Sequence, residues 1–318
     1  MILNDNQLCM NLHHTANWVA DVDEAMHRYG ILLGLHGERV GDSAVMRCMH
    51  EDFCLVLHPA GDNKPGLNYV AYELRPGLSL ADAKTAVEER GSSAEIIPIP
   101  LRGSGLLLHD CDGNRVVLVE RVPAADRRPA VMIETNTLQG YHPRRLGHVN
   151  YLTDNATQFY EWYRDVLGFR LTDWIGDAAC WMHIDARHHV IAVLNKGYKH
   201  IHHVAYELVD WSDIRNALDH LGKHGRWQTW GPLRHGMAQN LASYWRMWEE
   251  EMFIELCCDM QVLEADHEPI VHPDNPYASN TWGQLPPRTY FRFDDEAIHH
   301  EREQTYAYVD SYFSKQVA

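Results

Sequence analysis

The sequence predicts an α+β protein of two domains, in which each domain is a pair of βαβββ modules forming one curved mixed sheet. Two observations support this prediction. One strand motif occurs twice almost unchanged, as Tyr69-Val-Ala-Tyr-Glu-Leu74 and His203-Val-Ala-Tyr-Glu-Leu208. In addition, a strand, a helix and further short strands follow one another four times at roughly 60-residue spacing, which indicates an internal repeat. The length of 318 residues suits two such domains.

The N-terminal domain is expected over residues 1–122, as a module pair without a metal site. Its expected elements are a strand from about Leu8, a helix over Val22–Tyr29, strands through Val45–Leu57, the strand Tyr69–Leu74, a helix after Ser79 and a strand over Arg115–Val122. The second helix has the clearest signal, because Ser79 and Asp82 have the spacing of a capping box.

The C-terminal module pair is expected over residues 145–264, after a polar stretch at 123–145. Its expected elements are the strand Leu146–Tyr151, a helix carrying Phe159, Tyr163, Val166 and Leu167, a hairpin over Ala179–Asn195, the strand His203–Leu208, a helix capped by Ser212, and the strand Met252–Cys258. The tail, residues 265–318, is rich in Pro, His and Asp and is expected to cover this second domain.

Charge and cysteine content exclude several classes of protein. With 44 acidic and 28 basic residues, the formal charge is −16, which argues against binding to nucleic acid or to an anionic membrane. The N-terminus is polar, and no apolar run approaches the ~18 residues of a membrane span. The seven cysteines are odd in number and include no CxxC pair, which predicts reduced thiols in a cytoplasmic protein.

Three residues of the second module pair are candidate metal ligands. Alternate residues of a strand share a face, so His148, His203 and Glu255 would meet on one concave face if their strands pair in a curved sheet. Two imidazoles and a carboxylate, with open positions opposite, suit the non-haem Fe(II) oxygenases. In the first pair, Tyr69 stands where His203 stands in the second, and Glu120 resembles Glu255 but has no ligand partners. We therefore expect a metal only in the second pair.

Five motifs in residues 145–258 resemble, in order and spacing, the type I extradiol ring-cleaving dioxygenases of the vicinal-oxygen-chelate superfamily, which share the glyoxalase-like fold. The likeness is greatest to the catechol 2,3-dioxygenases and homoprotocatechuate 2,3-dioxygenases, and the N-terminal half matches only in its module plan. The motifs are Gly147-His-Val-Asn-Tyr151, Arg187-His-His-Val-Ile-Ala192, Ile201-His-His-Val-Ala-Tyr206, Gly231-Pro-Leu-Arg-His-Gly236 and Phe253-Ile-Glu-Leu256.

The resemblance implies extradiol cleavage of a catechol by O2, with Fe(II), or alternatively Mn(II), held by His148, His203 and Glu255. It also implies a homo-oligomer, in the family a tetramer, with a catechol and O2 as its small-molecule partners. His189 matches the family's acid/base histidine, and a shift of one residue would give that role to His188. The other implied roles are hydrogen bonds to the substrate oxygens for His235 and Tyr244, and places near the O2 side for Asn150 and Trp181.

The remaining expectations concern the rest of the pocket. Contacts to the ring are expected from Trp181, Met182, Met237 and the tail. Arg288 and Arg292 could meet an anionic substituent or could anchor the tail to the surface. His202 is expected to face away from the metal. The turn 247–252 is one residue longer than the family's usual turn before its glutamate, which leaves the placement of Tyr244 less well defined.

Two other functions fit the same fold. One is an O2-independent, metal-dependent lyase or isomerase of the glyoxalase type, but such sites usually take a fourth protein ligand from the other module pair, where Tyr69 stands. The other is a metal-free protein that binds a planar aromatic ligand. Such a protein would not need His148, His203 and Glu255 together, nor the pair of His235 and Tyr244.

Overall fold

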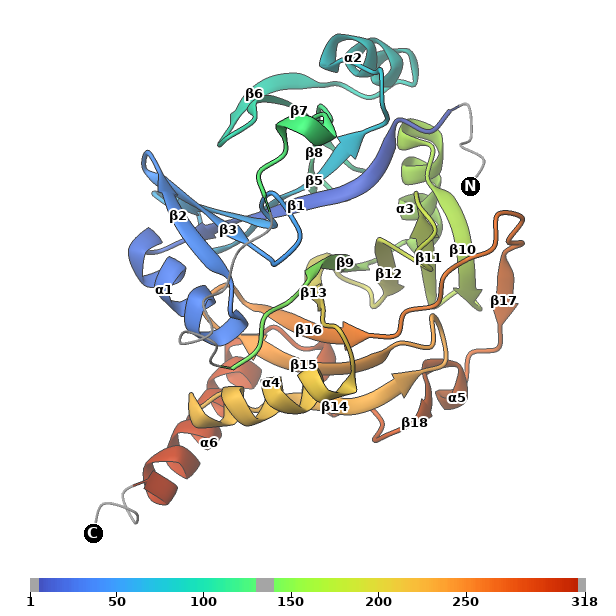
Figure 1. Cartoon of the computed structure of the whole chain (residues 1–318). Coiled ribbons are helices and arrows are strands. Elements are labelled where there is room, and N and C mark those ends of the chain that lie inside the picture. Colours follow the sequence, from blue (N-terminus) through green and yellow to red (C-terminus); the bar gives the residue numbers. More distant parts are fainter. Residues whose placement is uncertain (1–5, 130–139, 314–318) are drawn as a thin grey trace.

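The computed structural model describes residues 6–129 and 140–313, so residues 130–139 of the expected linker lie outside the described residues. The N-terminal half forms one eight-stranded sheet, in the order β2-β3-β4-β1-β5-β8-β7-β6 (Figure 1). Its strands are β1 (Cys9–Val19), β2 (His36–Val40), β3 (Ser43–Arg47), β4 (Leu55–Pro59), β5 (Gly66–Leu74), β6 (Glu95–Ile99), β7 (Gly103–His109) and β8 (Arg115–Val119). Its helices are α1 (Val22–Leu33), α2 (Leu80–Glu89) and the short η1 (Ala124–Asp126).

The C-terminal half forms a ten-stranded sheet, in the order β17-β10-β11-β12-β9-β13-β16-β15-β14-β18. Its eight module strands are β9 (Arg145–Thr153), β10 (Arg170–Ile175), β11 (Ala179–His183), β12 (Ile191–Asn195), β13 (His200–Glu207), β14 (Gln228–His235), β15 (Leu241–Met247) and β16 (Met252–Cys258). Its helical segments are α3 (Ala156–Trp162), the π-helical turn η3 (Tyr163–Leu167) and α4 (Trp211–Lys223).

Each sheet consists of two βαβββ modules joined through their first strands. In the N-terminal sheet β1 and β5 pair antiparallel, and each also pairs in parallel with the last strand of its own module, β4 or β8. The C-terminal sheet repeats this plan, with β9 and β13 at its centre and β12 and β16 as their parallel partners. The predicted architecture of two curved, mixed sheets is therefore confirmed.

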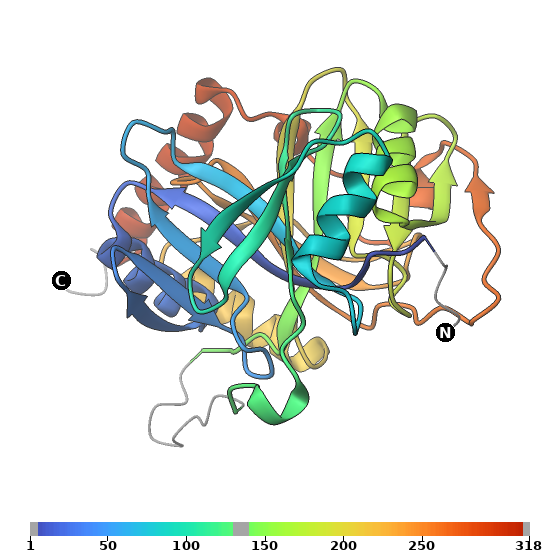
Figure 2. The same cartoon turned by 90° about the horizontal axis from the view of Figure 1, so that it is seen from above.

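The tail extends both edges of the C-terminal sheet. Strand β17 (Ile270–His272) pairs with β10, and β18 (Asn280–Trp282) pairs with β14. Between and after them lie α5 (Pro276–Ser279), η4 (Arg288–Phe291) and α6 (Asp295–Phe313). Figures 1 and 2 show this segment, in orange and red, running along the C-terminal sheet before α6 points away with the chain's end.

The sequence located one helix cap correctly and another incorrectly. Ser79 and Asp82 form the predicted capping box at the start of α2. The cap of α4 is Asp210 rather than Ser212, because the Asp210 carboxylate accepts hydrogen bonds from the backbone N–H groups of Ser212 and Asp213. Either residue type can cap a helix, so the sequence alone did not separate the two positions.

One apolar core joins the two halves. Leu12 of β1 and Tyr29 of α1 belong to the same buried cluster as Val149 of β9 and Tyr206 of β13. The seven cysteines form no disulfide. Within the described ranges, no helix is both long and apolar enough to cross a bilayer.

Candidate metal centre

Three adjacent strands carry His148, His203 and Glu255 to one face of the C-terminal sheet. His148 on β9 and Glu255 on β16 both lie opposite Ala205 of β13, from its two sides. His203 precedes Ala205 by two residues, so its side chain leaves the strand on the same face as that of Ala205. All three side chains are at least 96% buried. Strand register therefore brings together the three ligands that the sequence predicted.

The three donor atoms form a nearly equilateral triangle. His148 Nε2 lies 3.2 Å from His203 Nε2, and Glu255 Oε2 lies 2.9 Å from the first nitrogen and 3.0 Å from the second. A cation with bonds of ~2.1 Å holds two donors at right angles ~3.0 Å apart. The triangle thus matches one face of an octahedral coordination shell, which leaves the opposite face open.

The protonation states of these residues also suit a cation. Burial lowers the pKa of His203 to about 4, although the neighbouring Glu255 works against this shift. For Glu255, burial disfavours ionisation, but its interactions with His148 and His203 outweigh burial and hold the pKa well below its usual value. A carboxylate and an imidazole lone pair that converge on one point repel each other unless a cation lies between them. The donor set therefore fits a divalent metal of the kind found at sites with two histidines and one carboxylate.

Further contacts orient the ligands. Asn240 donates from Nδ2 to the outer oxygen of Glu255, at 3.0 Å, which leaves Oε2 for the histidines. His203 Nδ1 lies 2.7 Å from His202 Nδ1, and His202 Nε2 donates to the carbonyl of Tyr290 in the tail, at 2.9 Å. His202 faces away from the point where the three donor atoms converge, as expected, but its Nδ1 contacts the far side of the His203 ring. Such contacts on the far side of a ligand set its orientation.

A cavity of about 500 Å³ opens beside the three ligands. His189 lines it, with its ring centroid 4.2 Å from that of His148. His235 and Tyr244 also line it, and they are hydrogen-bonded to each other at 2.7 Å. The other lining residues that the sequence predicted are Asn150, Trp181 and Met237.

Four predicted pocket residues do not line this cavity. His188 is buried and bonded to Asp173, and Met182 is fully buried in the main core. Arg292 lies on the surface, where it pairs with Asp294 and Glu296, and Arg288 is exposed on η4. Successive strand residues face opposite sides of the sheet, which explains why Trp181 reaches the cavity and Met182 does not.

Several lining residues were not predicted. The tail supplies a wall of the cavity through Leu285, Pro286, Tyr290 and Phe291, and Lys196 lies with its ammonium group 4.2 Å from the ring centroid of Phe291. Trp230 stacks on Tyr244, with ring centroids 5.1 Å apart. The sequence did indicate that the tail covers the site, but it carries no periodic signal that singles out these residues.

The N-terminal sheet holds a counterpart of the site in which three of the four positions differ. His14 lies opposite Ala71 as His148 lies opposite Ala205, and Tyr69 takes the place of His203. The ring of Phe53 lies 4.7 Å from that of His14, as His189 lies beside His148. Val117, opposite Ala71, occupies the place of Glu255.

The expectation that Glu120 corresponds to Glu255 was therefore wrong. Glu120 follows the end of β8, and its carboxylate accepts a hydrogen bond from the backbone N–H of Leu80 at the start of α2. Two groups of three His, Cys, Asp or Glu residues in the described chain are close enough to hold an ion. They are His148, His203 and Glu255, and Cys48, Glu51 and Cys54, so neither includes His14.

Comparison with known proteins places the chain in a family. The model of the Glyoxalase/Bleomycin resistance protein/Dioxygenase superfamily matches residues 145–246. The manganese-dependent 2,3-dihydroxybiphenyl 1,2-dioxygenase of Geobacillus genomosp. 3 is 35% identical over 251 residues, which cover 73% of this chain and 79% of that protein. Metapyrocatechase 2 of Cupriavidus necator is 28% identical over 169 residues, so the match spans 48% of this chain and only 53% of that relative.

Solved structures show the same fold. Homoprotocatechuate 2,3-dioxygenase from Brevibacterium fuscum, in complex with 3,4-dihydroxyphenylacetate, has a TM-score of 0.78 at 20% identity. The match covers 91% of this chain and 94% of that chain. A Mn(II)-bound glyoxalase from Novosphingobium aromaticivorans has a TM-score of 0.77 at 22% identity, and the match covers 90% of this chain and 94% of that chain. Together with the sequence relatives, these findings show that the chain belongs to the glyoxalase and dioxygenase superfamily and, within it, to the extradiol ring-cleaving dioxygenases.

Proposed function

We propose that this protein opens the ring of a catechol with O2, beside the two adjacent hydroxyl groups, at an Fe(II) or Mn(II) ion held by His148, His203 and Glu255. One observation carries the proposal: the three donor atoms form one face of a coordination shell, and its open side meets a cavity of about 500 Å³. In the net reaction one ring C–C bond breaks and both atoms of O2 enter the product. The named activity of the Geobacillus relative supports the choice of reaction and makes manganese as plausible a metal as iron.

The metal would hold both catechol oxygens and O2 together and would supply the electron path between them. Around it, the protein's own groups handle protons and charge. Burial lowers the pKa of His189 well below its usual value, with repulsion from His148 and His188 adding to the effect. His189 is therefore neutral near pH 7, and a neutral imidazole that lines the cavity can take a proton from a catechol hydroxyl group and later return it.

His235 and Tyr244 are suited to stabilise charge on the substrate oxygens. His235 Nδ1 donates to the carbonyl of Ser279, at 3.0 Å, which leaves Nε2 to face the Tyr244 hydroxyl group. Burial, together with the nearby Glu255, raises the pKa of Tyr244 well above its usual value, so the phenol keeps its proton. In the structure the phenol donates this proton to His235 Nε2, and the same proton, turned toward a substrate oxygen, can stabilise negative charge where it develops.

The shape of the cavity favours a catechol with an apolar substituent. Away from the three ligands its walls include Ile175, Leu285, Pro286 and Phe291, and apolar groups predominate along it. The predicted cationic partners Arg288 and Arg292 lie outside it, and the ammonium group of the lining residue Lys196 lies over the ring of Phe291. We therefore infer an aryl or alkyl catechol, in agreement with the substrate named for the Geobacillus relative.

The experiment is to load the purified protein anaerobically with Fe(II) or Mn(II) and offer plain, alkyl, aryl, carboxylated and trihydroxylated catechols. We expect one O2 consumed per catechol, a yellow ring-opened product, and the highest kcat/KM for aryl or alkyl catechols. Turnover of a hemithioacetal without O2, and none of any catechol, would instead identify a glyoxalase-type lyase. Binding of catechols without turnover at full metal load would identify a binding protein.

The division of labour between the halves and the assembly are further proposals. We infer that residues 1–122 support the catalytic half without binding metal, because Tyr69, Phe53 and Val117 replace three groups of the site. The tetramer and the cytoplasmic location remain predictions. Light scattering on the metal-loaded protein tests the first of them.

A further inference from the structure

Three pairs of adjacent histidines in this chain share one geometry. The two Nδ1 atoms face each other at 2.7 Å in His13–His14, at 3.2 Å in His188–His189 and at 2.7 Å in His202–His203. Two neutral imidazoles that face each other in this way share one proton between these nitrogens, so one ring donates and the other accepts. We call the first histidine of each pair the outer ring and the second the inner ring. The group that contacts Nε2 of the outer ring therefore decides which nitrogen of the inner ring is protonated.

In the pair beside the cavity, the outer ring is held by a carboxylate. His188 Nε2 lies 3.1 Å from Oδ2 of Asp173, and both side chains are almost fully buried. Burial works against ionisation of Asp173, but the hydrogen bond from His188 outweighs it and the pKa stays below its usual value. An ionised carboxylate only accepts, so His188 carries its proton on Nε2 and presents a bare Nδ1 to His189.

The consequence for His189 follows directly. Its Nδ1 must carry the proton that it donates to His188, and its Nε2 then has a free lone pair. Among the described residues Nε2 of His189 has no hydrogen-bond partner, and the ring lines the cavity. In addition, the hydroxyl group of Thr172 donates to the backbone carbonyl of His188, at 2.6 Å, and thereby holds the pair in place.

We propose that Asp173, acting through His188, is a positioning residue that keeps Nε2 of His189 unprotonated toward the substrate. The tautomer assignment rests on the contacts of His188 with Asp173 and His189, while its kinetic consequence rests on the proposed function, in which His189 accepts a catechol proton.

The other two pairs differ in the group at Nε2 of the outer ring, which is an acceptor for His202 and a donor for His13. His202 Nε2 donates to the carbonyl of Tyr290, so it acts on the metal ligand His203 as His188 acts on His189 and leaves Nε2 of His203 bare. His13 is held by a donor instead, the guanidinium of Arg102. That contact reverses the pair, so that His14 carries its proton on Nε2, facing the hydroxyl group of Tyr69 at 3.3 Å. The chain thus contains a reversed copy of the same device at its non-metal site.

Asp173 has a second task that any test must separate from the first. It holds the tail, because its Oδ1 accepts from the backbone N–H of Ile270, at 3.2 Å, and its Oδ2 faces His272 Nε2 at 3.2 Å. A substitution that only loosened β17 would destabilise the protein without changing the tautomer of His189. The variants Asp173→Asn and Asp173→Ala distinguish these possibilities, since the amide of Asn can donate to His188 Nε2 as Arg102 donates to His13, whereas Ala offers neither donor nor acceptor.

The first measurement is the ¹⁵N NMR spectrum of the histidine rings in protein loaded with Zn²⁺, a diamagnetic ion that accepts the same donors. We expect Nε2 of His189 to be unprotonated in the wild-type protein and protonated in Asp173→Asn. His272→Gln, which removes one tail contact of Asp173, serves as the matched control and should leave the signal unchanged. An Asp173→Asn protein with the wild-type tautomer overturns the proposal, whatever its activity.

The second measurement is steady-state turnover of the Fe(II) or Mn(II) enzyme. Asp173→Asn should keep its metal and its KM and lose kcat by roughly 10- to 100-fold, less than the roughly 10²–10⁴ expected for loss of the acid/base group itself. Asp173→Ala should unfold more easily than Asp173→Asn but lose less kcat, and His272→Gln should retain wild-type kcat. A purely structural role predicts instead that Asp173→Ala is both less stable and slower than Asp173→Asn. If no catechol is turned over at all, the proposed function fails and the NMR result alone decides the inference.

Discussion

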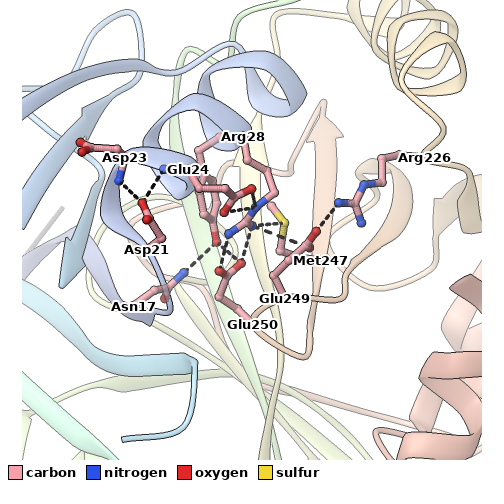
Figure 3. A network of polar contacts seen from close by, with 10 residues as sticks. Asn17, Asp21, Asp23, Glu24, Arg28, Arg226, Met247, Glu249 and Glu250 are labelled. Carbon is pink, nitrogen blue, oxygen red and sulfur yellow. Dashed lines mark hydrogen bonds and ion pairs between the residues drawn. The ribbon is translucent and has the colours of Figure 1, made fainter. Parts of the chain in front are cut away.

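The guanidinium of Arg28 donates to both carboxylate oxygens of Glu250, with Nη1 and Nη2 each 2.8 Å from one oxygen (Figure 3). Arg28 belongs to α1 in the N-terminal half, and Glu250 lies in the turn between β15 and β16, five residues before Glu255. The hydroxyl group of Tyr29 donates to the same carboxylate, at 3.1 Å. The N-terminal half therefore holds the turn that leads into the strand of Glu255.

Removing one partner of this buried pair should be costly. The side chains of Arg28 and Glu250 are 7% and 1% exposed, so Arg28→Met would leave a buried carboxylate without its cation. We expect the free energy of unfolding to fall by about 3–5 kcal/mol, and the paired change Arg28→Met with Glu250→Leu to lose much less. Denaturant titration measures both. Arg164→Ala, which breaks an exposed pair with Asp165, is the control and should leave the midpoint in place.

Metal content should depend on the three ligands and on nothing in the N-terminal half. His148→Ala, His203→Ala and Glu255→Gln should each lose most bound metal while keeping the wild-type circular dichroism spectrum, because the sheets do not need the ion. His14→Phe, at the counterpart of His148, should keep one metal per chain. Full metal and turnover in His203→Ala, or a second equivalent that disappears in His14→Phe, would refute the assignment of one site.

His189→Phe should separate metal binding from proton transfer. Phe stands at the equivalent place in the N-terminal half, as Phe53, so the substitution suits the space beside the histidine. We expect unchanged metal content and catechol binding, with kcat lower by roughly 10²–10⁴. Stopped-flow measurement of single turnovers checks this expectation. Loss of metal in His189→Phe would show instead that this residue is a ligand.

Arg246 should control access of the substrate rather than of the metal. Its guanidinium donates to the tail carbonyls of Arg292 and Thr289, both at 3.1 Å, and pairs with Glu301 at 2.7 Å. Arg246→Met would release the segment that supplies Tyr290 and Phe291 to the cavity wall. We expect KM for an aryl catechol to rise severalfold at full metal content. An unchanged KM would mean that the tail wall does not touch the substrate.

Stability should decline toward alkaline pH through Glu51. Burial raises the pKa of Glu51 to about 8, in spite of a hydrogen bond from the backbone N–H of Leu146. A raised pKa means that the folded state keeps a proton that the unfolded chain has released. The stability that Glu51 contributes is therefore complete below the usual glutamate pKa and is lost as pH rises through about 8. Denaturation from pH 5 to pH 9 should show a smaller decline in Glu51→Gln than in the wild type. Equal declines would refute the role of Glu51.

The sequence predicted the four modules, in two pairs, and the strands that carry the three candidate ligands, because strand alternation is a local property. His148 and His203 could be placed on one face from their own segments, and the repeat showed that Tyr69 replaces a histidine. The carboxylate position of the N-terminal half could not be found in this way. Counting from the end of the repeat suggested Glu120, whereas the pairing register of β8 selects Val117.

Contacts between distant segments left no comparable signal. Arg28 and Glu250 are 222 residues apart, and Tyr290 reaches His202 across 88. The tail carries none of the periodicity that marks a buried face, so Arg288 and Arg292 were considered on charge alone. The structure places both outside the cavity and gives the cavity wall to their uncharged neighbours Tyr290 and Phe291.

The dependence of His202 on the Tyr290 carbonyl has a consequence for how the protein is made. Translation delivers Glu255, the last ligand, before it delivers Tyr290, so a growing chain has all three donors while His202 still lacks its acceptor and the cavity its tail wall. A metal that binds at this stage meets an open site in contact with water. The cavity is therefore completed by the tail, after synthesis has passed the three residues proposed to bind the ion.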